Sequence, residues 1–203
     1  MTQSLSGAAV AGDSRDHRLI DLVSLATLQN LQDRFAALGR MTVCIATTEG
    51  DLITSPTWGS RYSELLGASP KGGESLVEGI QCGAKSADPS RAVTCHEGMQ
   101  LYTSPILHDG QTLALLAVGT RKHAAPPEEQ LRRIASEYEV PPDELQAAAA
   151  LLDPRRGGTR EAINRFADVL AHIVATLYGQ AERIARQLDD LRTVHGLADL
   201  RVA

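Results

Sequence analysis

The segment MQLYTSPILHDGQTLALLAVGT, residues 99–120, holds two β-favouring runs on either side of Asp109-Gly110. An Asp-Gly pair readily adopts the left-handed backbone conformations of a two-residue turn, so it is a strong signal for a β-hairpin. We therefore expect strands over 99–107 and 111–120. This hairpin should form the centre of an antiparallel sheet.

The residues before the hairpin predict a helix, a strand and a return strand. Apolar side chains keep helical spacing from Leu19 to Leu38, and Gly39 is a plausible C-terminal cap. The β-favouring run 41–46 follows, and residues 52–54 can return antiparallel to it. Frequent glycines and prolines between 58 and 88 allow only short helices, which we expect to cover one face of the sheet as a lid.

The residues after the hairpin predict only helices, over 128–138, over 143–152 and from Thr159 onward. In the last helix an apolar residue recurs every seventh position, as in a coiled coil. These positions are Ile163, Leu170, Leu177, Ile184, Leu191 and Ala198. We expect the first half of this helix to pack on the domain and the part beyond Gly179 to pair with a second copy. The alternative is that its last turns fold back on the rest of the domain.

These elements predict an α+β fold: a PAS-like antiparallel sheet with a helical lid, followed by a helical extension that ends in a coiled-coil-like signalling helix. We expect four segments along the chain. They are a disordered lead-in over 1–16, a sensor domain over 17–125, short helices over 126–158 and a long signalling and dimerisation helix over 159–203.

Composition excludes several classes of function. The 203 residues carry a formal charge of −5 and no block of lysine or arginine, so nucleic-acid binding is not expected. The cysteines are three in number and the N-terminal residues do not form a secretion signal, which favours a reducing cytoplasm without structural disulfides. No apolar run approaches the ~20 residues of a membrane span.

Cys82 and Cys95 are the first candidate site residues. On a helical wheel over 74–88, Cys82 falls nearly opposite the apolar side chains, so it can serve as a pocket or redox group as well as a structural one. Cys95 and His96 are adjacent, and in a strand their side chains leave on opposite faces, which disfavours a shared metal or a Cys-His catalytic pair. A metal site formed by Cys82 and Cys95 stays an alternative, although the paired zinc-binding signatures are absent.

The remaining candidates line the space between sheet and lid. Trp58 and Tyr62 lie where a loop enters the lid, as core anchors or as pocket walls. In the first hairpin strand, one row of alternate residues is more polar than a closed core needs, and we expect it to face the lid. The predicted ligand site consists of Trp58, Tyr62, Cys82, Cys95, His96, Gln100, Tyr102 and Ser104. His108 is predicted to be a solvated turn residue with no site role.

The residues Cys82, Cys95-His96-x-Gly98 and Pro105-Ile106 resemble the pattern of the PocR sensory domain, and Leu19-Ile20-Asp21-Leu22 is similar to its opening. The resemblance implies a PAS-like sheet whose helical side encloses a small organic molecule such as a short diol, and an exit through the later helices to an output domain. Family members often carry another cysteine where this chain has Arg61-Tyr62-Ser63.

We therefore predict a cytoplasmic, non-enzymatic sensory module of a bacterial signal-transduction protein. Its expected partners are a small-molecule ligand, a second copy through the C-terminal helix and an effector domain of the parent protein outside this chain, with neither nucleic acid nor membrane. Two alternatives stay open. One is a metal or redox sensor that uses Cys82 and Cys95, and the other is a ligand-free dimerisation scaffold. The sequence names no cofactor beyond that possible metal ion.

Overall fold

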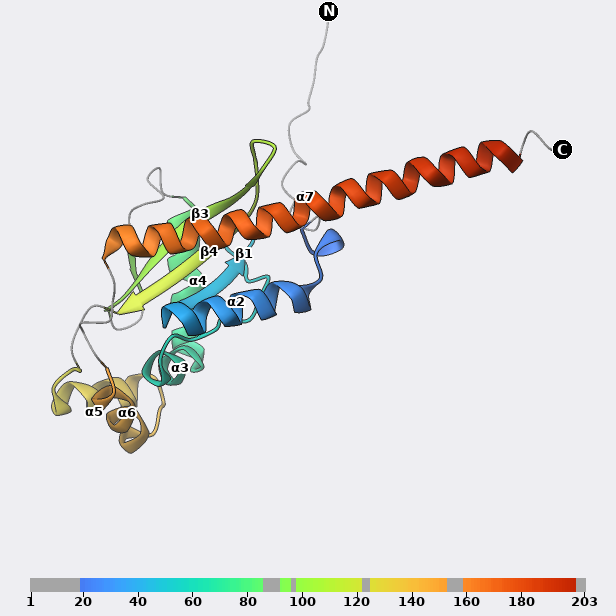
Figure 1. Cartoon of the computed structure of the whole chain (residues 1–203). Coiled ribbons are helices and arrows are strands. Elements are labelled where there is room, and N and C mark those ends of the chain that lie inside the picture. The colour runs from blue at the N-terminus through green and yellow to red at the C-terminus, as the bar shows by residue number, and fades with distance from the viewer. Residues whose placement is uncertain (1–18, 86–91, 96–97, 122–124, 153–158, 200–203) are drawn as a thin grey trace, which may run out of the picture.

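The computed structural model describes residues 19–85, 92–95, 98–121, 125–152 and 159–199. Figure 1 shows a sheet with a helix on either side, a small group of helices at one end, and a long helix that runs past the sheet. The labelled elements are α2 (Leu25–Gly39), β1 (Thr42–Ala46), α3 (Arg61–Gly67), α4 (Pro70–Ala84), β2 (Val93–Cys95), β3 (Met99–His108), β4 (Gln111–Arg121), α5 (Glu128–Glu137), α6 (Pro142–Ala150) and α7 (Arg160–Asp199).

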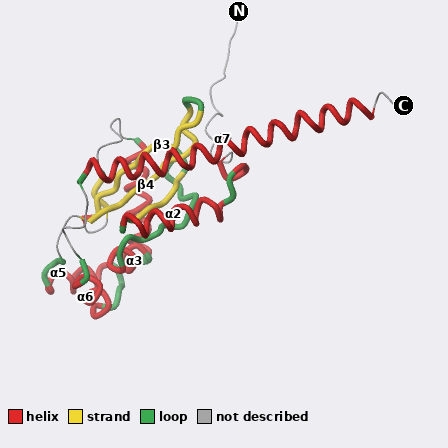
Figure 2. The backbone as a smooth tube through the Cα atoms, viewed as in Figure 1, coloured by secondary structure: helices red, strands yellow, loops and turns green. Residues whose placement is uncertain are grey.

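The described strands form one antiparallel sheet in the order β1-β4-β3-β2. The β3–β4 hairpin occupies the two central positions, as its sequence predicts. Asp109 and Gly110 form the turn with φ angles of 49° and 75°, the left-handed values that the Asp-Gly pair tolerates. Figure 2 shows this hairpin extending beyond the rest of the sheet. The predicted return strand over 52–54 is reduced to a single bridge between Ala46 and Leu52.

Each face of the sheet packs against different helices. α4 covers one face, where Leu76 and Ile80 join Cys44, Leu101 and Ala117 in a buried cluster. α2 and α7 cover the opposite face in a larger cluster. The side chains that the sheet, α2 and α7 contribute to this larger cluster include Val43, Ile45, Tyr102, Ile106, Leu116, Val118, Leu28, Ala36, Ile163, Leu170 and Val174.

The predicted helix over 19–38 is wrong in one respect, because it is interrupted before Leu25. Ser24 has an extended backbone, and its hydroxyl accepts a hydrogen bond from the Thr27 amide. Serine is a preferred N-cap residue, so it starts a new helix, α2, at this point. Gly39 ends that helix, and Arg40 follows it in the left-handed conformation.

The expectation of only short helices in the lid is also wrong. α4 runs for 15 residues and contains Gly72, Gly79 and Gly83 on its buried side. A methyl group on Gly83 would lie 2.7 Å from Thr103 Cγ2, and one on Gly72 would lie 1.9 Å from the Leu66 carbonyl oxygen. These glycines therefore let the helix approach its neighbours closely, and that packing offsets their low helix propensity.

α3, α5 and α6 form a separate buried cluster at one end of the molecule (Figure 1). Tyr62 of α3, fully buried, lies in this cluster with Ile134 and Leu145. The predicted helices over 128–138 and 143–152 are both present, as α5 and α6.

α7 changes environment along its length. Up to Tyr178 one side is buried against the sheet, whereas Ile184, Leu188 and Leu191 are 57%, 51% and 56% exposed. Figure 1 shows this second half extending away from the domain, so the alternative in which the last turns fold back is wrong for residues up to 193. No described helix, α7 included, is long and apolar enough to cross a membrane.

Candidate functional site

A pocket of about 270 Å³ lies between the C-terminal end of α4 and the sheet. Gly83 and Ala84 of α4 form one wall, and side chains of the β3–β4 hairpin form the other. The full lining is Thr48, Gly83, Ala84, Thr103, Pro105, Thr112 and Leu115. The pocket is thus on the lid side of the sheet.

The lining consists of threonine and apolar residues. Thr48, Thr103 and Thr112 carry hydroxyl groups, which can both donate and accept hydrogen bonds, and the other lining residues are apolar. None of the lining residues is charged. Such a surface suits a small neutral molecule with one or two polar groups, because an ionic ligand would lose its hydration without gaining a counter-charge.

A larger hollow of about 400 Å³ lies between α3 and the turn that joins α5 to α6. It borders neither the sheet nor α7. The Arg61 guanidinium at its edge is 3.1 Å from a Glu64 carboxylate oxygen and 3.3 Å from one of Glu144, so these carboxylates already balance its charge. A third hollow of about 300 Å³ lies between α2 and α6 and is bordered by Trp58, but no strand residue lines it. We therefore take the pocket between α4 and the sheet as the candidate site.

The lid residues predicted for the site are dispersed in the structure. Trp58 packs at the edge of the cluster under α4, with its ring against Gly67. Tyr62 lies in the α3–α5–α6 cluster and does not face the sheet. Cys82 is exposed, as its position on the helical wheel predicts, and it points away from the apolar side of α4.

The predicted orientation of β3 is wrong. The alternation along the strand is as expected, but the row that faces α4 contains Leu101 and Thr103, whereas Tyr102 lies in the cluster on the α7 side. Ser104 on that second face donates a hydrogen bond of 3.0 Å to Asp168 of α7. The row predicted to face the lid therefore faces α7, where Asp168 accepts the hydrogen bond of Ser104, and the pocket is lined by Thr103 and Pro105 of the other row.

The two remaining candidates are Cys95, of which only the backbone is described, and His96. β2 ends at Cys95, which pairs with Met99 of β3, and α4 contacts this strand. The Cys95 side chain and His96 lie outside the described residues. Among the described residues, the group with metal-ligand spacing contains no cysteine, and it consists of His108, Asp109 and Glu182.

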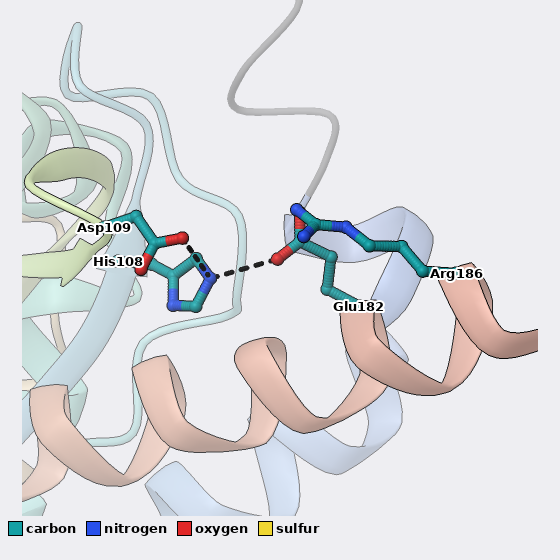
Figure 3. Close-up of polar contacts among 4 residues, drawn as sticks. All are labelled: His108, Asp109, Glu182 and Arg186. Carbon is teal, nitrogen blue, oxygen red and sulfur yellow. Dashed lines mark hydrogen bonds and ion pairs between the residues drawn. The ribbon is translucent and has the colours of Figure 1, made fainter.

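Sequence reasoning missed His108, which is not a solvated turn residue. Its Nε2 lies 3.1 Å from Glu182 Oε2 of α7, and its ring packs edge-on against Tyr178 with centroids 5.0 Å apart. Figure 3 shows Arg186 on the far side of the same carboxylate. These hydrogen bonds, that of His108 above all, lower the pKa of the Glu182 carboxyl. The hairpin tip is thereby tied to α7 next to its projecting half.

β3 connects the pocket to α7. Thr103 and Pro105 line the pocket on one face, while Tyr102 and Ser104 contact α7 or its cluster on the other. β3 is therefore closely packed on both faces, with the pocket on one side and the α7 interface on the other.

α4 covers a pocket on one face of the sheet, and α7 packs on the other face and extends beyond the domain. This arrangement is that of a PAS-like sensory module. The family model described as the sensory domain found in PocR matches residues 21–182. The chain belongs to this family, and both the predicted family and the predicted α+β fold are confirmed. The comparisons with curated proteins and with solved structures find no match.

Proposed function

We propose that the chain is the ligand-binding sensory module of a bacterial signal-transduction protein. A small organic molecule binds between α4 and the β3–β4 hairpin, and its presence is passed through β3 to α7 and on to an output domain. The observation that supports this proposal is the shared strand, because β3 contributes side chains to the pocket and to the α7 interface. The module itself performs no catalysis, and it works in the cytoplasm.

The ligand is a short neutral alcohol, diol or related metabolite. The volume of about 270 Å³ is slightly below the ~300–1,000 Å³ of sites for drug-sized molecules, so it suits a compound of few heavy atoms. The Thr103 and Thr112 hydroxyls provide hydrogen bonds for its polar groups, and Leu115, Pro105 and Ala84 contact its carbon chain.

Filling the pocket tests its role. Ala84→Leu places three more carbon atoms at the pocket wall, and leucine keeps nearly the same helix propensity as alanine. In a thermal-shift screen over short alcohols and diols, we expect the native chain to melt at a higher temperature with its ligand. Ligand at a hundred times its dissociation constant stabilises by ~2.7 kcal/mol, and Ala84→Leu should lose this gain.

The matched control is Ala147→Leu, the same change at an exposed position of α6. This variant should respond to the ligand as the native chain does. A ligand that stabilises Ala84→Leu as strongly as the native chain would place the binding site elsewhere. If no compound stabilises the native chain, the ligand-free scaffold becomes the better interpretation.

We further propose that the projecting half of α7 pairs with α7 of a second copy. Ala181, Ile184, Leu188 and Leu191 alternate at spacings of three and four residues, the pattern of a coiled-coil seam. The last three are about half exposed and lie on one side of a continuous helix, so an identical stripe on a second copy is complementary to them.

A further inference from the structure

The contact between the hairpin tip and α7 brings together three side chains that commonly ligate metal ions. His108 Nε2 lies 3.1 Å from Glu182 Oε2 and 3.6 Å from Asp109 Oδ2. All three ligand atoms lie within 4.8 Å of one another. Figure 3 shows the imidazole and the two carboxylates directed toward a common point between the turn and the helix.

The distances suit an ion at that point. A zinc ion binds histidine nitrogen and carboxylate oxygen at about 2.0–2.2 Å, so two ligand atoms on it are separated by about 3.0–3.6 Å. The two separations measured from His108 Nε2 are of this size. The His108 imidazole therefore lies at a ligand-to-ligand separation from each carboxylate, and the two carboxylate oxygens lie within 4.8 Å of each other.

Neighbouring groups orient each ligand. The His108 ring packs edge-on against Tyr178, and Gly179 leaves room for it, because a methyl group there would lie 2.7 Å from Cε1 of the ring. Arg186 donates a 2.7 Å hydrogen bond to Oε1 of Glu182, which leaves Oε2 directed at His108. The turn sets the backbone of Asp109 at a φ of 49°. The hydrogen bond from Arg186 is a supporting contact of the kind that orients a carboxylate metal ligand.

We propose that His108, Asp109 and Glu182 form a site for a divalent transition-metal ion of the zinc type that bridges the β3–β4 hairpin to α7. An imidazole among the ligands selects such an ion over calcium or magnesium, which prefer oxygen ligands alone. The histidine binds as the neutral tautomer protonated at Nδ1, with the Nε2 lone pair on the ion. Water completes the coordination on the exposed side of Asp109. The ion holds α7 to the sensor at the point from which the helix projects.

Zinc titration by calorimetry tests this site directly. The full chain carrying Cys82→Ser is the parent, so that the exposed thiol contributes no binding. We expect one zinc ion to bind per chain. The heat of binding should not appear when zinc is titrated into the same buffer without protein. Asp109→Asn preserves the turn, since Asn-Gly is equally suited to it, and Glu182→Gln preserves side-chain shape. Each should weaken zinc binding by at least ~10-fold, because loss of a group that only supports a ligand already weakens metal binding by ~10–100-fold.

Asp189→Asn is the control, because it removes an exposed carboxylate from the same helix outside the cluster. It should bind zinc as the parent does. The proposal is overturned if the parent takes up no zinc, or if Asp109→Asn and Glu182→Gln bind it as tightly as Asp189→Asn. Zinc binding is read without the organic ligand, so failure here leaves the pocket between α4 and the sheet unaffected.

Discussion

Tyr102→Ala is expected to lower the free energy of unfolding by about 3–5 kcal/mol, the range for removing a large aromatic side chain from a core. Tyr102 is 2% exposed and packs between β3 and the helices on the α7 side of the sheet. Its loss leaves a cavity that the surrounding strands and helices cannot fill. Urea denaturation followed by circular dichroism measures the change.

Tyr102→Phe separates the ring from the hydroxyl. The hydroxyl lies 3.4 Å from Gln100 Oε1, a long hydrogen bond, so its removal should cost no more than about 1 kcal/mol. Comparable losses for both variants would show that the hydroxyl and not the buried ring provides the stability. A loss below about 1 kcal/mol for Tyr102→Ala would contradict the packing of this face.

Changing Ile184 and Leu191 together to glutamate is expected to abolish self-association. Each aliphatic side chain stabilises the interface that buries it by ~1.5–3 kcal/mol, and about half of each of these surfaces is still available. Ile184, Leu188 and Leu191 on both helices together supply roughly 4–9 kcal/mol. Association itself costs roughly 4–15 kcal/mol, so we expect a dimer that dissociates on dilution.

Sedimentation equilibrium over a range of concentrations measures the effect. The native chain should approach twice its chain mass as concentration rises, and the double variant should stay at one chain mass while melting as before. Val169→Glu is the control, since Val169 is 53% exposed on α7 but lies outside the stripe. A double variant that still doubles its mass would place the dimer interface elsewhere.

Local signals in the sequence were sufficient for the central hairpin and the start of the long helix. Asp109-Gly110 specifies a tight turn by its own backbone preferences, so the pairing beside the turn, His108 with Gln111 and Leu107 with Thr112, follows from neighbouring residues. From Ile106 onward an irregularity shifts the register by one residue. The Thr159 hydroxyl accepts a hydrogen bond from the Ala162 amide, which starts α7 where the sequence predicts it. The sevenfold apolar spacing likewise identifies the face of that helix that is buried in its first half, at Ile163 and Leu170, and exposed in its projecting half, at Ile184 and Leu191.

The candidate site depends on which face of β3 meets α4 and on the length of α4, and neither can be predicted from neighbouring residues. Alternation along β3 identifies two rows of side chains but not the layer that each row meets. The polarity of Ser104 suggested a pocket, whereas Asp168 of α7 accepts its hydrogen bond on the sheet face opposite the pocket. The length of α4 could not be predicted from its sequence either. Glycines weaken an isolated helix, but here Gly83 allows close contact with Thr103.

The sequence by itself determined the α+β class, the hairpin at the centre of the sheet and the apolar stripe of α7, because turn preference and side-chain periodicity are properties of adjacent residues. Only the tertiary structure decided which face of β3 lines the pocket and which meets α7. It alone brought His108 to Glu182, 74 residues later in the chain. Such contacts depend on how whole layers pack, and the free energy that selects one packing is shared among many buried side chains.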